Sequence, residues 1–367
     1  MTRILETIYS VSNVEGGPGT VALELHAALS DLGNDCTLLT VGHVVRNKAD
    51  QVGTVSEQPG RQFGYYGFSG RYCRQLLSAS RDADYLVIHG VYSFTTIASL
   101  LCAILRSKPY LLIPHGSLKR EAERHPVLKH IADVVFVKIL MRNASAVFFA
   151  SEKERRECRV PITARSVEVA PFGVAVIDSL DNTRSDQILH VAYLGRVARV
   201  KRLDVLVRAI AQVKAERPIS CQIIGPVDGV VEHKLKTLAV RLGASESIAF
   251  MGTVPRVEVS EALAESDVLV LSSESENFGL AAVEALAVGL AIIVTEQVGM
   301  LEFVHGSPVV RSFPVGDSLA LGGELLRIDV SGDARSERRR SARKLAASVF
   351  SWDAYARKIL IAMGSRE

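Results

Sequence analysis

Along the chain, short runs of apolar residues alternate with longer stretches in which apolar residues recur at helical spacing. In the first half, the apolar runs predict strands at 4–12, 36–41, 85–89, 110–114, 146–150 and 166–170. The helical patterns between them predict helices at 19–32, 95–105, 127–141 and 151–158. Strands that are apolar throughout are typical of a parallel sheet covered by helices on both faces.

The same alternation restarts after a polar, turn-prone stretch at 173–187, which is the predicted linker. Strands are predicted at 189–194, 221–224, 248–251, 268–271 and 291–295. Helices are predicted at 203–216, 231–242, 257–266, 280–288, 334–349 and 352–363. The predicted fold class is therefore α/β, with two doubly wound Rossmann-like domains at 1–178 and 179–350 and a C-terminal helix at 351–367.

Composition narrows the function classes. The chain has 367 residues, of which 48% are hydrophobic and 23% charged, an ordinary balance for a globular protein. Its 43 basic and 40 acidic residues give a net charge of +3, which lacks the clustered basic footprint of a nucleic-acid binder. No apolar run has the length of a membrane span. Five scattered cysteines without a Cys-x-x-Cys pair argue against disulfides and structural zinc, and so favour a cytoplasmic location.

The helix predicted at 334–349 carries a run of basic residues. These are Arg335, Arg338, Arg339, Arg340, Arg343 and Lys344. Such a run is typical of a solvated helix face, and contact with an anionic membrane surface is the alternative.

Two motifs in the first half could carry chemistry. The first strand runs into Gly16-Gly17-Pro18-Gly19 and then a helix, an arrangement that suits an anion but also a simple tight turn. The glycine pattern and the acidic residue of a dinucleotide site are missing, so no redox cofactor is expected. His115 follows the fourth strand within Pro114-His115-Gly116-Ser117, where it could serve a ligand or be a structural histidine.

Cations and acids in the second half lie after predicted strands. Arg196 ends the first of these strands, and Lys201 precedes a helix, a pair that could receive a diphosphate. Glu276 lies in the loop before the helix that begins near Gly279, and Glu284 lies inside that helix. An acid within an otherwise apolar helix is costly without partners, which favours a function for Glu284.

Taken together and in order, these residues resemble the retaining glycosyltransferases of family 4. The resemblance covers nearly the whole chain. It rests on the glycine loop at 16–19, Pro-His-Gly at 114–116, Pro-Phe-Gly-Val at 171–174, Gly195-Arg196 with Lys201, Gly225, the Glu276 and Glu284 pair, Gly299 with Glu302, Pro314 to Asp317, and Ser351-Trp352. The chain departs from the family pattern at Phe172 to Ala175, where no polar role is assigned, and at Arg202, where a glycine is frequent.

The resemblance implies two Rossmann-like domains facing across a cleft, with the C-terminal helix crossing back to the first domain. It also implies roles on the donor side. Arg196 and Lys201 would neutralise the donor diphosphate, and backbone amides at Phe278, Gly279 and Leu280 would contact phosphate. Glu284 would bind the ribose hydroxyls.

The resemblance further implies that Glu276 holds hydroxyls of the transferred sugar, that His115 lies beside that sugar, and that Gly17 helps to close the cleft. His115, Glu276, Arg196 and Lys201 are thus the expected catalytic residues. The reaction would transfer a hexosyl group from a nucleotide-diphosphate sugar to an acceptor hydroxyl with retained configuration. Neither a metal ion nor any cofactor besides the donor is expected.

The expected acceptor is a glycan or lipid-linked glycan in bacterial surface polysaccharide or glycolipid assembly. Peripheral contact with an anionic membrane is a weaker expectation, and a solvated surface is an equal alternative for the basic residues that carry it, which are Lys119, Arg120, Arg124, Lys129, Lys138 and Arg142. A nucleotide-sugar epimerase, a phosphorylase of similar architecture, and a sugar- or nucleotide-binding protein without turnover are the alternatives.

Overall fold

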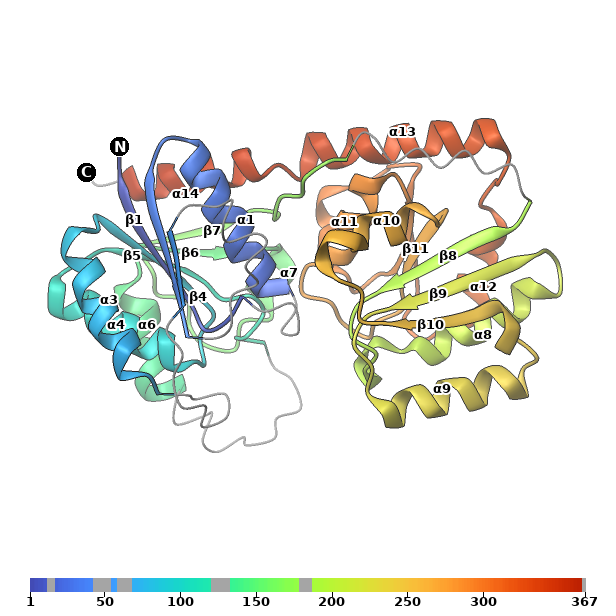
Figure 1. Ribbon diagram of the computed structural model, residues 1–367, viewed down its shortest axis with the longest axis horizontal. Helices are drawn as coiled ribbons and strands as arrows, with labels where there is room; N and C mark the ends of the chain where they lie inside the picture. The colour runs from blue at the N-terminus through green and yellow to red at the C-terminus, as the bar shows by residue number, and fades with distance from the viewer. Residues whose placement is uncertain (12–16, 42–53, 58–67, 120–132, 178–186, 365–367) are drawn as a thin grey trace. The chain divides into compact units, whose positions relative to one another are not determined.

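A computed structural model of the chain describes residues 1–11, 17–41, 54–57, 68–119, 133–177 and 187–364. The chain divides into two compact units, and each is described by itself (Figure 1). Unit 1 comprises Met1–Gly173 and Trp352–Glu367, and unit 2 comprises Val174–Ser351.

Unit 1 is built on a parallel sheet in which the strand order is β3-β2-β1-β4-β5-β6-β7. The strands are β1 (Arg3–Ile8), β2 (Asp35–Thr40), β3 (Thr54–Glu57), β4 (Tyr85–His89), β5 (Tyr110–Ile113), β6 (Ala146–Phe149) and β7 (Ser166–Val169). The helices are α1 (Gly17–Asp31), α3 (Gly70–Asp82), α4 (Phe94–Arg106), the π-helical turn η2 (Asp133–Val137), α6 (Lys138–Asn143), α7 (Glu152–Arg156) and α14 (Trp352–Gly364).

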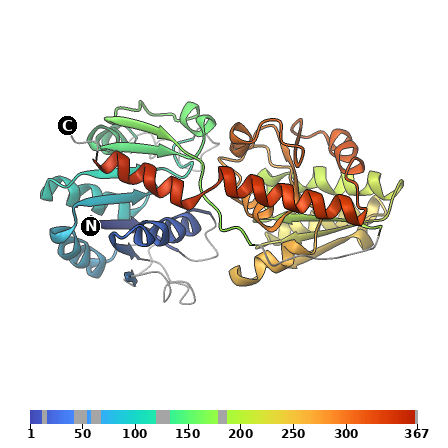
Figure 2. The same ribbon diagram turned by 90° about the horizontal axis from the view of Figure 1, so that it is seen from above.

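Helices cover both faces of this sheet. On one face α1 packs beside α14, and on the other α3 packs beside α4 (Figures 1 and 2). The central strands are buried on both faces, which is why their sequences are apolar runs rather than alternating patterns. The packing of α14 on α1 confirms the prediction that the final helix returns to the first domain.

Unit 2 repeats this design with a parallel sheet in the order β10-β9-β8-β11-β12-β13. The strands are β8 (Leu189–Leu194), β9 (Ile219–Ile224), β10 (Ile248–Gly252), β11 (Val268–Leu271), β12 (Ala291–Thr295) and β13 (Val310–Phe313). The longer helices are α8 (Leu203–Lys214), α9 (Gly229–Arg241), α10 (Val259–Ala264), α11 (Leu280–Val288), α12 (Ser318–Leu326) and α13 (Gly332–Val349). The 3-10 turns are η3 (Arg199–Lys201), η4 (Ser245–Ser247), η5 (Arg256–Glu258) and η6 (Gly299–Phe303).

The helices of unit 2 also form two layers. One layer places α8 between α9 and α12, and the other places α11 between α10 and α13 (Figure 1). Two doubly wound domains are thus confirmed. The sequence pattern did not predict β3, α3, β13 or α12. The helix predicted at 127–141 is divided into η2 and α6, and its residues 127–132 lie outside the described part of the chain.

The chain passes from unit 1 to unit 2 at Gly173 and returns at Trp352. A Cβ atom built on Gly173 would lie 2.3 Å from the backbone nitrogen of Trp352, so any side chain there would collide with the start of α14. Aromatic rings reinforce this place in unit 1, since Phe172 stacks on Trp352 and meets Tyr355 edge to face.

The basic run on α13 is only partly solvated, so the predicted solvated face is wrong for several of its residues. Arg335 and Arg339 are buried. Nε of Arg335 donates to Oδ1 of Asp267 at 2.8 Å. Arg339 donates to the carbonyl oxygens of Ala264 and Ser266 at 2.8 and 3.1 Å, where the last carbonyls of α10 need partners.

These arginines therefore bind α13 to the sheet and to α10 rather than to solvent. Among the helices that the structure describes, none is both long and apolar enough to cross a bilayer.

We predict that Arg335→Ala destabilises unit 2 by about 1.5–3 kcal/mol, because Asp267 would lose its more buried ionic partner and keep only Arg338. The matched control is Arg340→Ala on the same helix, whose exposed ion pair with Glu337 should contribute less than about 1 kcal/mol. Urea unfolding followed by circular dichroism measures both. Equal losses in the two variants would contradict the assignment.

Candidate functional site

The candidate site in unit 2 lies where the strand order reverses. β8 and β11 are neighbours at the centre of the sheet, and the chain leaves them toward opposite edges, to β9 and to β12. Loops that follow the carboxyl ends of two such strands are the usual ligand-binding place in a doubly wound sheet. Here these loops are residues 195–202 after β8 and 272–279 after β11.

An ion pair joins the two loops. Nζ of Lys201 contacts Oε1 of Glu276, and Ser273 donates its hydroxyl to the same oxygen at 3.0 Å. The Ser272 hydroxyl donates to the backbone oxygen of Lys201 at 2.9 Å, which holds the start of one loop against the other. The Lys201 and Glu276 side chains are 20% and 18% exposed, so the pair is shielded yet reachable from solvent.

Arg196 belongs to the same loop as Lys201 and is exposed. Tyr193 donates its hydroxyl to the backbone oxygen of Arg196 at 3.0 Å. Burial and the charge of Glu276 raise the pKa of Tyr193, so its hydroxyl stays protonated and serves as this donor. Among the described residues, no ion-pair partner of Arg196 is found, and its guanidinium is free to bind an anion.

Two glycines, one of them next to Arg196, allow close packing at the carboxyl ends of β8 and β9. Gly195 and Gly225 follow β8 and β9 and have positive φ angles of 147° and 136°. A Cβ on Gly225 would lie 2.2 Å from the carbonyl oxygen of Gly195. The two turns therefore touch backbone to backbone, which only glycine allows.

The helix α11 begins at Leu280 beside the ion pair. Its N-cap residue Gly279 has a φ of 92°, and no side chain in the described part of the chain caps this helix end. A Cβ on Gly279 would lie 2.5 Å from Cγ1 of Val298. Phe278 is buried against Phe303 and Phe350, so its ring belongs to the core. What α11 offers to a ligand is its first backbone amides, which favour an anion.

Glu284 on α11 is also paired. Its Oε1 lies 2.5 Å from an Nη atom of Arg256 in η5, and its side chain is 12% exposed. The expectation that an acid in this apolar helix needs a partner is thus met within the protein. Arg256 was not predicted, because 28 residues separate it from Glu284 and no motif surrounds it.

In unit 1, His115 lies two residues after β5 in a left-handed conformation, with a φ of 53°. Its ring stacks on that of His89, with centroids 5.2 Å apart, and Nε2 of His115 lies 3.0 Å from Nδ1 of His89. Glu154 of α7 holds the turn by accepting from the Gly116 amide at 2.6 Å. Desolvation and the facing charge of His89 lower the pKa of His115 well below its usual value, so the ring is neutral.

Gly17, the other predicted residue of unit 1, is the first residue of α1 and follows the loop after β1. Gly16 lies outside the described residues. A Cβ on Gly19 would lie 3.0 Å from Cα of Val11, so the start of α1 packs closely on the end of the β1 segment. Gly17 and His115 thus follow the carboxyl ends of two strands of one sheet, with β4 between them.

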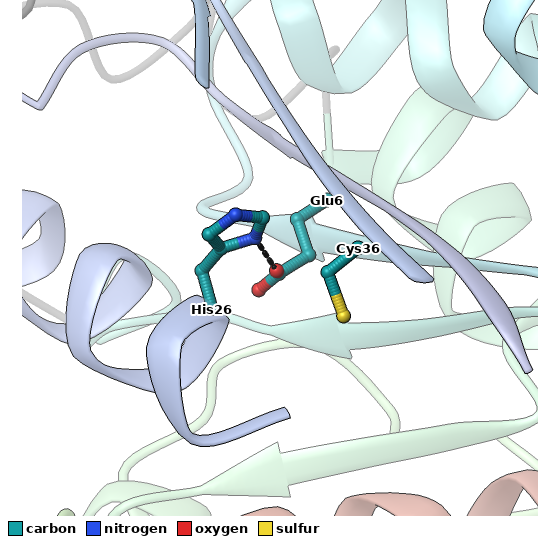
Figure 3. A group of neighbouring side chains, drawn as sticks. All are labelled: Glu6, His26 and Cys36. Atoms are coloured by element: carbon teal, nitrogen blue, oxygen red, sulfur yellow. Dashed lines mark hydrogen bonds and ion pairs between the residues drawn. The ribbon is translucent and has the colours of Figure 1, made fainter. Parts of the chain in front are cut away.

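A buried carboxylate lies behind His89. Glu6 of β1 is fully buried, and its Oε1 accepts from Nδ1 of His26 on α1 at 2.6 Å (Figure 3). Its Oε2 lies 3.7 Å from Nε2 of His89. Burial opposes ionisation of Glu6, but the two histidines outweigh it and lower the pKa of this carboxyl.

Among the described residues, one group has the spacing of a metal site. It consists of Glu6, His26 and Cys36, all buried (Figure 3). Its members are already engaged in the free protein, since His26 donates to Glu6 and burial raises the pKa of the Cys36 thiol to about 12. An ion would have to displace both that hydrogen bond and the thiol proton.

The structure thus joins Lys201 to Glu276, places Arg196 in the loop of Lys201 and the start of α11 directly after the loop of Glu276, and pairs Glu284 with Arg256. Sequence reasoning also missed Glu6 and His89. Both could have been noticed in the sequence, because Glu6 interrupts the apolar run of β1 and His89 ends that of β4, and a polar group in such a run needs a partner.

Of the predicted basic region, Lys119 is paired with Glu157 at 2.9 Å, while Lys138 and Arg142 are exposed. Arg120, Arg124 and Lys129 lie outside the described residues.

Comparison with known proteins adds two family models. The model "Glycosyltransferase Family 4" matches residues 15–176, and "Glycosyl transferases group 1" matches residues 181–306. A D-inositol 3-phosphate glycosyltransferase of Pseudarthrobacter chlorophenolicus is 28% identical over 250 residues, which are 63% of this chain and 60% of that protein. The corresponding protein of Nocardia farcinica is 32% identical over 44% of this chain and 37% of its own. The chain thus spans at most about three fifths of these relatives.

Solved structures show the same fold. Anabaena HepE in complex with UDP-glucose superposes with a TM-score of 0.79 at 16% identity, with both chains fully covered. Sucrose-phosphate synthase from Thermosynechococcus elongatus superposes with a TM-score of 0.75 at 18% identity over 98% of both chains.

The Glu6 cluster predicts a pH dependence of stability. Because its folded-state pKa is lowered, Glu6 contributes stability that is complete above the ordinary value of 4.5 and is lost as the pH falls through the folded value. We expect wild type to exceed Glu6→Gln by about 1–3 kcal/mol in unfolding free energy at pH 7, with the difference shrinking below pH 4.5.

Urea unfolding between pH 3.5 and 7 measures this difference. The control is Glu337→Gln, an exposed glutamate whose replacement should change the free energy by less than about 1 kcal/mol. A difference for Glu6→Gln that grows as the pH falls would contradict the assignment.

Proposed function

Because this chain belongs to the glycosyltransferases of family 4, we propose that it transfers a hexosyl group from a nucleoside diphosphate sugar to an acceptor hydroxyl, with retention of anomeric configuration. The observation that carries this proposal is the Lys201–Glu276 pair at the strand-order reversal of unit 2, with Arg196 and the uncapped start of α11 beside it. A cation, an acid and free amides together suit a ligand that carries both phosphates and hydroxyls. The binding of UDP-glucose by HepE supports the choice of donor class.

On this proposal, donor binding breaks the ion pair between Lys201 and Glu276 and gives each side chain a new partner on the donor. Phosphate oxygens of the donor take over the Lys201 ammonium, and Arg196 binds the same diphosphate through its planar guanidinium. Glu276, released from Lys201, then accepts hydrogen bonds from hydroxyls of the transferred sugar. Glu284 binds the ribose hydroxyls, with Arg256 holding its carboxylate in place.

Departure of the nucleoside diphosphate builds up negative charge on the leaving oxygen. Lys201, Arg196 and the first amides of α11 would stabilise that charge in a site that needs little reorganisation. We propose that these groups of the chain perform this task without a metal ion. The retaining course would follow from departure and attack on the same face of the sugar, since no carboxylate is assigned as a covalent nucleophile.

We propose that His115 of unit 1 contacts the transferred sugar and that Gly17 allows the start of α1 to approach the ligands closely. The acceptor is proposed to be a glycan or lipid-linked glycan of bacterial surface polysaccharide or glycolipid assembly. For contact with an anionic membrane, Lys138 and Arg142 are the exposed cations of the predicted basic region, whereas Lys119 is held by Glu157.

The proposal predicts that Lys201→Ala lowers kcat/KM by about 10²–10³, the effect of removing one group that stabilises developing charge. The matched control is Lys236→Ala, which removes a lysine from an exposed ion pair with Glu232 in the same unit and should change kcat/KM less than twofold.

The measurement is release of nucleoside diphosphate from a panel of nucleotide sugars with glycan and lipid-linked acceptors, followed by NMR of the anomeric configuration of the product. Wild-type turnover by Lys201→Ala, or an inverted product, would overturn the assignment of the diphosphate site or of the stereochemistry.

A further inference from the structure

The proposed function does not use the buried groups behind His115. Glu6, His89 and His115 come from β1, from β4 and from the turn after β5, three strand segments adjacent in the sheet of unit 1. Among the residues that the structure describes, neither Oε2 of Glu6 nor Nε2 of His89 has a hydrogen-bond partner, yet the two atoms face each other at 3.7 Å. On the other side of the His89 ring, Nδ1 is hydrogen-bonded to Nε2 of His115 at 3.0 Å. The three side chains therefore form a line from the core to a partly exposed imidazole.

The ionised Glu6 carboxylate at the buried end of this line needs a positive partner. An ionised carboxylate in dry surroundings is very costly unless a positive partner compensates it. The only titratable groups described within reach of Glu6 are His26, His89 and Cys36, and the protonated Cys36 thiol supplies no charge. One of the two histidines has to carry the compensating proton.

The hydrogen-bond partners of the two histidine rings indicate which of them carries the proton. Charging His26 would place an N–H at its Nε2, a buried atom that has no hydrogen-bond partner among the described residues. Charging His89 instead places its Nε2–H in ion-pair contact with the Glu6 carboxylate at 3.7 Å and its Nδ1–H against the Nε2 lone pair of His115. A buried N–H without an acceptor loses its hydration and gains no bond in return, so the proton belongs on His89.

We propose that Glu6 is a positioning residue that holds a proton on His89, so that His89 donates from Nδ1 to Nε2 of His115 and leaves His115 a neutral ring with its proton on Nδ1. The neutral state agrees with the lowered pKa of His115. In this tautomer Nδ1 of His115 is an N–H donor, and the one acceptor lone pair of the ring, on Nε2, is already engaged by His89.

The consequence for the reaction rests on the proposed function. His115 would donate a hydrogen bond to an oxygen of the transferred sugar, and it could not act as the general base that takes the proton of the acceptor hydroxyl. Glu6 and His89 would thus decide which hydrogen bond His115 makes to the sugar.

The direct test is NMR of the full-length protein labelled with ¹⁵N-histidine, in which long-range couplings distinguish the two neutral tautomers and the charged ring. The His115 signals are assigned by their loss in His115→Asn. The expected result is a neutral His115 protonated at Nδ1 together with a His89 protonated at both nitrogens at pH 7. A His115 protonated at Nε2, or a charged His115, would overturn the proposal.

Variants then test the part played by Glu6. In Glu6→Gln, His115 should lose its single tautomer and show a mixture, and an unchanged Nδ1–H ring would contradict control by Glu6. Should this variant fail to fold, His89→Asn and His89→Leu form a second pair. The asparagine amide can still donate to Nε2 of His115 and should preserve the tautomer, whereas leucine cannot and should abolish it. The same tautomer in both variants would contradict the relay.

Activity supplies a readout of the donor role. His115→Asn keeps an N–H near the position of Nδ1 and should retain most of kcat/KM, whereas His115→Gln and His115→Leu should lose about tenfold, the worth of one hydrogen bond. Equal losses in all three variants would overturn the donor role. The NMR result does not depend on any reaction, so failure of the proposed function and failure of this inference are seen in different measurements.

Discussion

The ion pair between Lys201 and Glu276 is the interaction on which the proposed donor site of unit 2 depends. It joins the loops after β8 and β11, the two neighbouring strands from which the chain turns to opposite edges of the sheet. The pair forms because two other constraints hold. Gly195 and Gly225 let the strand ends approach within backbone contact, and Gly279 lets α11 begin against Val298. A cation and an acid so placed stabilise each other in the free protein, and phosphate and hydroxyl groups can replace each of them as partners.

The same physical rule accounts for charges far from that pair. Asp267 and Arg335 are buried together, and Glu6 is buried with His26 and His89. In each case the sequence separates the partners by at least 20 residues, and the fold brings them together. Because a lone buried charge is so costly, each pair ties distant segments to one arrangement, α13 to the start of β11 in unit 2 and α1 to β1 in unit 1.

The elements with strong patterns could be predicted from sequence, and the partners of their charges could not. Val268–Leu271 and Leu280–Val288 were predicted to the residue, since an apolar run and a compact apolar helix are unambiguous signals. β13, with its mixed sequence Val-Arg-Ser-Phe, was missed because an edge strand is only half buried. The basic run on α13 was misinterpreted because local sequence does not reveal that Asp267 and the last carbonyls of α10 lie opposite it. Likewise Glu284 could be recognised as needing a partner, but Arg256 could not be named.

The central claim is that the loops after β8 and β11, with the start of α11, hold the diphosphate of a nucleotide sugar. Backbone hydrogen exchange of the full-length protein tests it most directly, with and without the nucleoside diphosphate that binds most tightly from a panel of uridine, guanosine, adenosine and thymidine diphosphates. The account predicts slower exchange at residues 195–202 and 276–284, with little change at the opposite ends of the same strands. Saturating nucleotide that leaves both segments unchanged while slowing exchange elsewhere would contradict it.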